Sequence, residues 1–470
     1  MTLRLLNTYT RKLQKFVPLK KNTVRMYTCG PTVWDYAHIG NFRTYVFQDV
    51  LRRYLEFKGY RVTQVTNITD VDDRTIHQSK ETGVTLNEYT RKYEEAYLAD
   101  LEALNIERAE HYPRATEHID EMVALVRKLI RRGFAYEAEG SVYFDISKFK
   151  AYGRLSGVRM DELKVGARID SDKYSKDEAR DFALWKGWRP EDGDVFWETA
   201  IGKGRPGWHL ECSAMSMKYL GSTFDIHSGG EDLIFPHHEN EIAQSEAATG
   251  KRFVRFWLHS GMLLVGGRKM AKSSGNFFTL RDLLSKGHEP LAVRYLLMSA
   301  HYRAQLNFTE DALTDAEKAV EALRGTHRRI NDVEKTSHHS NVQLREVLSR
   351  EKREFERAMD DDLNTPRALA AIHRAARAVN RGIDQGEVSA KDAAVIHQFF
   401  SDLDRVVGIL GGGVKTEELP EEAGRLIRER DQARANRDWA TADTLRKQLL
   451  AMGIVVEDAP GGTVWKRKLP

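Results

Sequence analysis

A strand–helix–strand pattern over residues 24–67 restricts the fold of this chain more than any other feature. Two β-favouring runs, 24–29 and 61–67, flank a segment with apolar residues at helical spacing, namely Phe47, Val50, Leu51, Tyr54 and Leu55. We expect this helix to begin near Thr44 and to stop at Gly59. Strands joined by a crossover helix run parallel, and their ligands bind beyond the carboxyl ends. The pattern therefore predicts a parallel sheet with a ligand site at its carboxyl edge.

The alternation of strands and helices is interrupted between residues 111 and 200. This segment is richer in Gly, Lys and Asp, and its β-favouring runs, such as 141–145, are short. Parallel-strand character returns at 224–228 and around 256–260. We therefore predict an α/β protein in which an inserted subdomain splits the parallel-sheet core.

The last third of the chain has a helical pattern. Apolar positions with a period of about 3.6 residues predict helices over 312–324, 346–359 and 367–381, which we interpret as an antiparallel bundle. A Gly-rich run at 410–414 and the acidic stretch after it indicate a linker. A basic helix and a short β-like tail are expected to follow it.

Composition excludes several classes of protein. With 41% hydrophobic and 30% charged residues, the chain is neither disordered nor fibrous. No run approaches the roughly 18 apolar residues that a membrane-spanning helix needs, and two cysteines are too few for a disulfide framework. We therefore expect a cytoplasmic protein with reduced thiols and no membrane partner. The net charge of +4, from 73 basic and 69 acidic residues, neither requires nor excludes a nucleic-acid partner.

The segment 30–41 joins the first predicted strand to its helix, where a phosphate-bearing ligand meets backbone N–H groups and the positive end of the helix dipole. Gly40 lets a ligand approach the main chain, and His38 can donate to a phosphoryl oxygen as charge develops. A tight turn with a helix-capping histidine explains the same residues.

A second motif, Lys269-Met-Ala-Lys272-Ser-Ser-Gly275, places two lysines and two hydroxyls in a Gly-containing loop. Such a loop can grip a pyrophosphate leaving group. A solvated basic loop is the alternative interpretation.

A third group of residues can bind a metal. Residues 235–241 open a predicted helix, with Pro236 in its first turn and Gly250 at its end. The i, i+4 spacing puts His237 and Glu241 on one face of that helix. Capping of a surface helix is the alternative.

Both cysteines of the chain, Cys29 and Cys212, could meet that face. Two thiolates, one imidazole and one carboxylate are ligand types that suit zinc. His238, Glu239 or His209 could substitute within this set, and burial of both thiols as small core residues is the simpler interpretation. Spacing alone does not decide between these arrangements.

These motifs resemble known signatures. His38-Ile-Gly-Asn41 resembles the HIGH signature of class I aminoacyl-tRNA synthetases, and Lys269-Met-Ala-Lys-Ser273 resembles their KMSKS signature. Longer stretches resemble the cysteinyl-tRNA synthetase family along nearly the whole chain, at 27–33, 67–70, 204–215, 229–233, 235–241 and 361–366.

The resemblance implies a Rossmann-type catalytic domain in two halves, 1–110 and 201–265, separated by a connective insertion at 111–200. The remaining segments would be a stem-contact segment with the lysine loop, a DALR-type helical bundle, and a linker with a small C-terminal anticodon-binding domain, at 266–310, 311–410 and 411–470.

The resemblance also implies the site residues and partners, which are ATP, L-cysteine and tRNA-Cys. One zinc ion per chain would be held by Cys29, Cys212, His237 and Glu241. ATP, arriving with Mg²⁺, would be bound by His38, Gly40, Asn41, Asp232 and Lys272. Cysteine would be held by Thr69, Trp208 and His209, and the catalytic groups would be His38, Lys269 and Lys272. The protein is expected to be a monomer.

Two positions depart from the signatures, since Asn41 replaces the last His of one and Ala271 the first Ser of the other. We expect these departures to change the rate and not the reaction. A mycothiol-pathway ligase that passes cysteine to an amino-sugar resembles the same core, but it is expected to lack the C-terminal region. A non-catalytic RNA-binding paralogue would have little need of the lysine loop together with both thiols.

Overall fold

The computed structural model describes residues 2–158, 168–169, 180–270, 275–331, 341–411, 421–436, 438–452, 454–459 and 462–467. It divides into two compact units, Met1–Leu410 and Gly411–Pro470. Within the described ranges, no helix has both the length and the apolar character needed to cross a bilayer.

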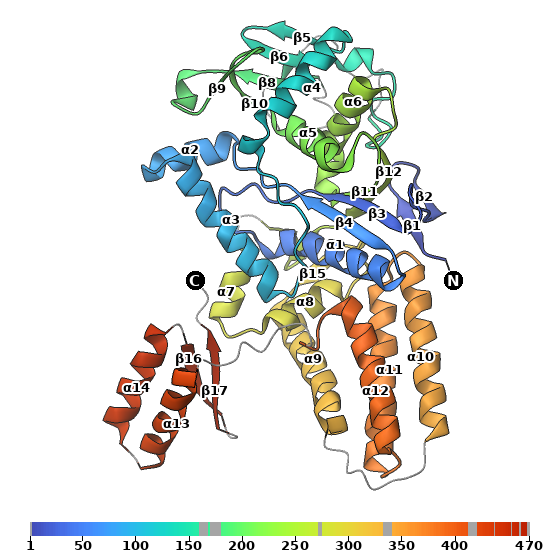
Figure 1. Cartoon of the computed structure of the whole chain (residues 1–470), viewed down its shortest axis with the longest axis vertical. Coiled ribbons are helices and arrows are strands. Elements are labelled where there is room, and N and C mark those ends of the chain that lie inside the picture. Colours follow the sequence, from blue (N-terminus) through green and yellow to red (C-terminus); the bar gives the residue numbers. More distant parts are fainter. Residues whose placement is uncertain are drawn as a thin grey trace. The chain divides into compact units, whose positions relative to one another are not determined.

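The first unit is built around a sheet of four parallel strands (Figure 1), in the order β12 (Val254–Ser260), β11 (Phe224–Gly230), β3 (Thr23–Thr28) and β4 (Arg61–Thr66). In the register of the sheet, Ile226 stands beside Met26 and Phe256, and all three side chains are buried. The predicted parallel sheet is therefore confirmed. Strands buried on both faces explain the continuous apolar runs in the sequence.

The crossover helix between β3 and β4 is α1 (Ile39–Phe57), which lies on one face of the sheet, while α5 (Trp208–Leu220) and α6 (Glu239–Thr249) lie on the other (Figure 1). Helix α1 begins at Ile39 and not near Thr44 as expected. His38 and Asn41 close a capping box there, and a polar first turn of this kind is not recognised from apolar spacing.

The chain between β4 and α5 leaves the sheet. It first forms α2 (Asp73–Thr82), α3 (Leu86–Ala103) and α4 (Ile119–Arg131). An antiparallel sheet follows, in the order β5 (Ala135–Ala138), β6 (Ser141–Phe144), β8 (Asp181–Gly187), β10 (Gly202–Pro206) and β9 (Trp197–Thr199), with β7 (Arg168–Ile169) paired to β8. Short 3₁₀ turns occur in this segment at Ala115–Glu117, Ile146–Lys148 and Pro190–Asp192, and another follows β11 at Glu231–Leu233. An inserted subdomain thus interrupts the parallel sheet.

After β12 the chain forms a small sheet, in the order β14 (Arg268–Lys269), β13 (Leu263–Val265) and β15 (Leu306–Phe308), and two helices, α7 (Leu280–Ser285) and α8 (Pro290–Met298). The N-terminal residues form a hairpin of β1 (Arg4–Asn7) and β2 (Lys12–Lys15).

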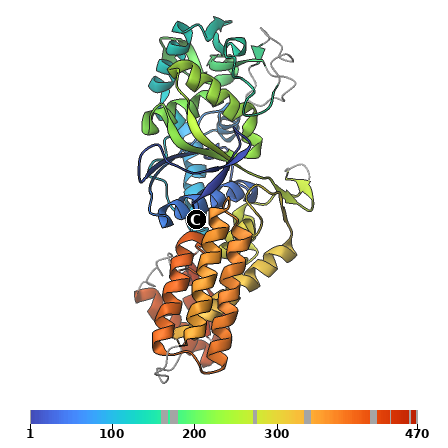
Figure 2. The ribbon, with the colours of Figure 1, turned by 90° about the vertical axis from the view of Figure 1, so that its right-hand side faces the viewer.

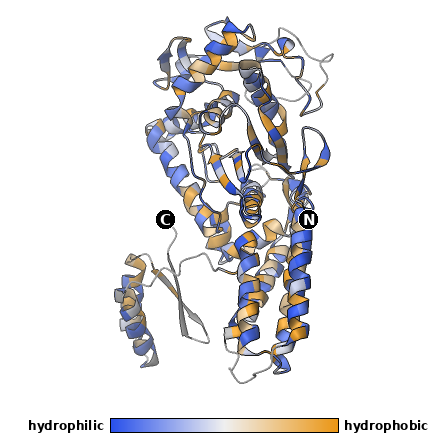
Figure 3. Cartoon of the chain, turned by 45° about the vertical axis from the view of Figure 1, so that its right-hand side comes forward, coloured by the Kyte–Doolittle hydropathy of each residue, from blue (hydrophilic) through white to orange (hydrophobic). Residues whose placement is uncertain are grey.

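Long helices complete the first unit and run side by side in two views (Figures 1 and 2), namely α9 (Glu310–Asn331), α10 (Val342–Asp360), α11 (Thr365–Asp384) and α12 (Ala390–Val407). Hydrophilic and hydrophobic residues alternate along the bundle helices (Figure 3), as expected for helices with one buried face. The helical periods at 312–324, 346–359 and 367–381 lie within α9, α10 and α11, whereas α12 was not predicted.

The second unit contains α13 (Glu421–Ala435), α14 (Trp439–Ala451) and an antiparallel pair, β16 (Ile454–Ala459) and β17 (Gly462–Arg467). The prediction of a single basic helix here is wrong, because α13 ends at Ala435. Asp438 then caps a second helix, since its side chain accepts from Thr441 N–H. The unit has its own apolar core, which includes Ala423, Leu426, Leu445, Leu449 and Ile454.

Candidate active site

Both cysteines converge with a histidine and a glutamate at the carboxyl edge of the parallel sheet. Cys29 follows β3, Cys212 lies in α5, His237 lies in the turn just before α6, and Glu241 lies in the first turn of α6. One ligand atom from each of these four buried residues lies within 4.8 Å of the other three. The structure therefore brings together the four residues that helix spacing and thiol chemistry had suggested.

The local structure around His237 differs from the sequence-based expectation. Phe235 has an extended backbone (φ −139°, ψ 133°), and the regular helix begins at Glu239, so Pro236 does not lie in its first turn. The turn at His238 is nevertheless right-handed helical. The expected proximity is confirmed, since His237 Nε2 lies 3.1 Å from Glu241 Oε1.

A second donor set shares two of these residues, because Cys29, His227, His238 and Glu241 also offer atoms within 4.8 Å of one another. Glu239, which the sequence left open as an alternative metal ligand, points away from the cluster and toward the insertion. Its carboxylate accepts backbone N–H groups of the insertion at 2.8 and 2.7 Å, from Gly153 and Ser156.

Hydrogen bonds around the cluster hold its imidazole rings in place. Nδ1 of His237 lies 3.1 Å from Nδ1 of His209, and Nε2 of His237 is on the side of Glu241, where it can act as a ligand atom when Nδ1 carries the proton. Nε2 of His227 lies 2.9 Å from Glu241 Oε2. Hydrogen bonds to ligand residues of this kind orient them toward a metal.

A further series of hydrogen-bond contacts ends at Cys29. Thr8 Oγ1 lies 2.8 Å from His259 Nδ1, and His259 Nε2 lies 2.8 Å from His238 Nδ1. Nε2 of His238 then lies 3.3 Å from Cys29 Sγ. If the Thr8 hydroxyl donates to His259, then His259 donates to His238, and the N–H on Nε2 of His238 points at the sulfur of Cys29. An N–H donated to the sulfur would stabilise the thiolate form of Cys29 once a cation offsets its burial.

Burial makes the cluster unfavourable for negative charge unless a cation joins it. Loss of solvent raises the pKa of both thiols, most strongly that of Cys212, and raises the pKa of Glu241 to about 8. The same burial lowers the pKa of His237 to about 3. A divalent metal binds neutral imidazoles, thiolates and carboxylates. Its positive charge would compensate for the burial of these anions. The residues therefore fit a metal ion.

A hydrogen-bond chain links the two elements that carry the cysteines. Gly30 N–H donates to Asn67 Oδ1 at 3.0 Å, and Asn67 Nδ2 donates to Thr69 Oγ1 at 3.2 Å. The Thr69 hydroxyl then donates to Glu211 Oε2 at 2.7 Å. Gly30 adjoins Cys29 and Glu211 adjoins Cys212, so the chain holds the two thiol-bearing backbones together. A Cβ on Gly30 would collide with the Asn67 carbonyl, which explains the glycine.

A cavity of about 540 Å³ opens beside the cluster and is lined by Cys29, Trp208 and His237 together with His38, Gly40, Asn41, Asp232 and Lys269. The Trp208 ring stacks on that of His237 with centroids 4.1 Å apart. Thr69 and His209, which the resemblance placed against cysteine, are buried behind this wall. Lys272, with residues 271–274, lies outside the described residues.

His38 combines the two interpretations left open by the sequence. It caps α1 because its Nδ1 accepts from Asn41 N–H at 3.2 Å, and the Asn41 side chain accepts from His38 N–H at 3.1 Å. Burial lowers the pKa of His38, although Asp232 opposes the shift. The neutral ring therefore carries its proton on Nε2, where it can donate to a ligand. Asn41, a departure from the signature, thus positions His38.

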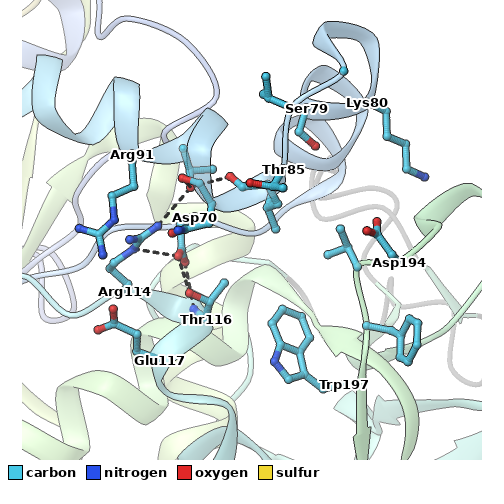
Figure 4. Close-up of a pocket in the computed structure, with 17 residues that line it drawn as sticks. Asp70, Ser79, Lys80, Thr85, Arg91, Arg114, Thr116, Glu117, Asp194 and Trp197 are labelled. Atoms are coloured by element: carbon cyan, nitrogen blue, oxygen red, sulfur yellow. Dashed lines mark hydrogen bonds and ion pairs between the residues drawn. The ribbon is translucent and has the colours of Figure 1, made fainter.

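A second cavity, of about 730 Å³, lies along α2 and α3 beside the insertion (Figure 4). In its wall Arg114 Nε lies 3.0 Å from Asp70 Oδ2, and the Thr116 hydroxyl donates to the same carboxylate. Its other charged groups are two cations and two anions, Lys80, Arg91, Glu117 and Asp194. This balance gives the cavity no preference for phosphate.

Comparison with known proteins agrees with this geometry. The family described as the tRNA synthetases class I (C) catalytic domain matches residues 15–318, the DALR domain matches 354–412, and the cysteinyl-tRNA ligase anticodon binding domain matches 416–465. The cysteine–tRNA ligase of Solibacter usitatus is 48% identical and covers 100% of both chains. That of Thermococcus onnurineus is 44% identical over 99% of both. The chain belongs to the cysteinyl-tRNA synthetase family.

The fold is also that of more distant class I synthetases. Methionyl-tRNA synthetase of Mycobacterium tuberculosis, in complex with methionyl-adenylate, has a TM-score of 0.60 at 16% identity, with 89% of this chain and 96% of that chain covered. The resemblance to the cysteinyl-tRNA synthetase family and the Rossmann-type α/β fold are thus confirmed.

Several residues around the site were not identified from the sequence, namely Asn67, Glu211, His227 and His259. His259 does carry a signal, since it is a polar residue near the carboxyl end of an apolar strand, and His227 is a polar residue in the middle of another. Asn67 and Glu211 act through partners distant in sequence, which no local pattern indicates.

Proposed function

We propose that the protein activates L-cysteine with ATP, giving cysteinyl-adenylate and pyrophosphate, and then transfers cysteine to the 3′ end of tRNA-Cys. The observation that carries this proposal is the buried donor set of two thiols, one imidazole and one carboxylate, which opens into the cavity that contains His38 and Asp232. A soft-ligand metal site beside a nucleotide site suits the recognition of a thiol-bearing substrate that ATP activates.

Selection of cysteine over serine is the main demand on such a site. An apolar pocket distinguishes near-isosteres by only about 100-fold. Zinc held by Cys29, Cys212, His237 and Glu241 would supply a Lewis acid that binds a thiolate far better than an un-ionised hydroxyl. Trp208, stacked on His237, would cover the substrate side of this centre. Thr69 and His209 would then support the cysteine pocket through Glu211 and His237.

ATP would lie along the start of α1. Gly40 permits close approach of its phosphates, the Nε2 proton of His38 would donate to them, and Asp232 would bind the ribose. Lys269 and Lys272 would stabilise the leaving pyrophosphate, and Mg²⁺ would accompany ATP. The protein would thus position the groups and stabilise charge, with no covalent intermediate on its own side chains.

The C-terminal segments favour tRNA over an amino-sugar as the acceptor. The chain matches its relatives over their full length, and residues 416–465 match an anticodon binding domain. We propose that the protein acts as a monomer in the cytoplasm.

The direct test of the proposal is ATP–pyrophosphate exchange with each of the twenty amino acids separately, without tRNA. We expect exchange with cysteine alone. Exchange driven by another amino acid, or no exchange with any, would contradict the proposed first step. Charging of tRNA-Cys transcripts then tests the second step.

Zinc binding to the metal-free protein is expected to release protons. Burial raises the pKa of both thiols and brings that of Glu241 to about 8, so all three groups are largely protonated at pH 7 and should release about three protons when zinc binds. The apparent zinc affinity should therefore rise with pH in this range. Calorimetric titration in two buffers of different ionisation enthalpy measures the number, and a release below about one proton would argue against thiolate ligands.

Lys272→Ala is expected to slow adenylate formation roughly 100- to 1000-fold at saturating ATP while changing ATP affinity little, because a charge on the leaving pyrophosphate acts mainly in the transition state. Rapid-quench measurement of adenylate formation checks this. Lys269→Ala is the comparison and should be milder. A normal rate in Lys272→Ala would refute the assigned role.

A further inference from the structure

The cavity has an aromatic wall that none of the roles above uses. Trp34 lies in the loop after β3, Arg74 lies in the first turn of α2, and both line the cavity. The guanidinium carbon of Arg74 is 5.2 Å from the centroid of the Trp34 ring. This is the distance of a cation–π pair. We call these two layered side chains the Trp34–Arg74 platform.

The positive charge of Arg74 is already compensated. Its Nε and one terminal nitrogen lie 3.0 and 2.8 Å from Asp72 Oδ2. What the platform presents is therefore a planar group with little net charge. Such a plane suits the face of a nucleobase, whereas an uncompensated guanidinium suits a phosphate.

The platform is held from both sides. Asp72 caps α2 by accepting Thr75 N–H at 2.8 Å, and the Tyr89 hydroxyl donates to the Trp34 carbonyl at 2.7 Å. The Arg74 side chain is nevertheless 38% exposed. A surface that is ordered and partly exposed loses little conformational entropy when a base binds.

The same loop carries a second stack of this kind. Tyr36 lines the cavity, and the guanidinium carbon of Arg281 lies 5.1 Å from its ring centroid. Arg281 Nε in turn lies 3.2 Å from Asp100 Oδ1. Unpaired bases stack on aromatic rings and on arginine guanidinium planes, and both kinds of group are layered here.

We propose that the Trp34–Arg74 platform stacks the base of the 3′-terminal adenosine of tRNA, which is the nucleotide that accepts cysteine. This inference rests on the proposed function, which requires the nucleosides of ATP and of the acceptor in one cavity. The residues assigned to ATP, His38, Gly40 and Asp232, lie at the start of α1 and after β11. The platform comes from other elements and is left for the second nucleoside. The adenine of ATP is the other source of the same chemistry.

The test separates the two half-reactions of the full-length, zinc-loaded enzyme. Arg74→Ala should leave cysteine-dependent exchange within about threefold of the parent, while single-turnover transfer from preformed adenylate to subsaturating tRNA should fall roughly 10- to 100-fold, as loss of one stacking side chain predicts. Arg74→Lys should lose nearly as much, because it keeps the charge and loses the plane. Trp34→Phe should retain most of the transfer rate.

Arg91→Ala is the matched control, since Arg91 is an exposed arginine on α3 that lines the second cavity. It should change neither half-reaction. A tRNA with an abasic 3′-terminal nucleotide should be a poor acceptor for the parent, and Arg74→Ala should add little to that loss.

Equal losses in exchange and transfer at an unchanged melting temperature would assign the platform to ATP and overturn the inference. Full rescue by Arg74→Lys would overturn it as well, because it would point to a phosphate contact. Failure of the parent itself in cysteine-dependent exchange would instead overturn the proposed function, and this inference with it.

Discussion

Cys212→Ser is expected to abolish stoichiometric zinc and to lower kcat/KM for cysteine by roughly 100-fold or more. Loss of a ligand should cost more than the roughly 10- to 100-fold typical of losing a side chain that only hydrogen-bonds to a ligand. Cys212 is fully buried in α5, and its sulfur lies within 4.8 Å of the three other donors. A serine there leaves a hydroxyl that does not ionise to replace the thiolate. Metal analysis and pyrophosphate exchange measure the two effects.

The change should be specific to the amino acid. KM for ATP should change far less, because the residues assigned to ATP lie on α1 and after β11. Any residual activity should discriminate cysteine from serine only about as well as a metal-free pocket does, near 100-fold. Ser216→Ala, on the same helix and equally buried, is the matched control and should retain zinc. Active enzyme without zinc, or an unchanged KM for cysteine in Cys212→Ser, would contradict the metal assignment.

A chain that ends at Leu410 is expected to keep cysteine-dependent exchange and to lose charging of tRNA-Cys. The first compact unit ends at that residue and contains the whole donor cluster and its cavity. The second unit has its own apolar core, so we expect the first unit to fold without it. The loss of charging should therefore appear as weaker tRNA binding and not as unfolding.

The second unit offers suitable chemistry for unpaired bases. Trp439 is 57% exposed, and the Arg434 guanidinium lies 5.7 Å from its ring centroid. Not every arginine there is available, since Arg430 is 2% exposed. Tight binding of tRNA by the intact chain should weaken steeply with salt, and the slope should be shallower for the truncated chain. A folded truncated chain with unchanged kcat/KM for tRNA would refute the anticodon assignment.

The sequence by itself predicted the parts of this protein that depend on local periodicity. Apolar residues at i, i+3 and i+4 identified α1, and β-favouring runs identified β3 and β4, because these patterns report one chain segment packing on one surface. The i, i+4 spacing of His237 and Glu241 likewise placed two donors together, since a single helical turn sets their distance. Capped or irregular termini were missed, as at Ile39 and Phe235, because polar caps carry no apolar period.

Only the tertiary structure decided which of the candidate donors meet. Cys29 and Cys212 lie far apart in sequence, and their convergence depends on the parallel order of β3 and β11 and on the packing of α5 against the sheet. The hydrogen bonds that orient the donors, such as the one that Asn67 accepts from Gly30 and the contact of His227 with Glu241, join elements that are far apart in the sequence. Sequence spacing determines geometry within one helix or strand, whereas the relative positions of different elements follow from burial of the whole core, and the site lies where several of those elements end.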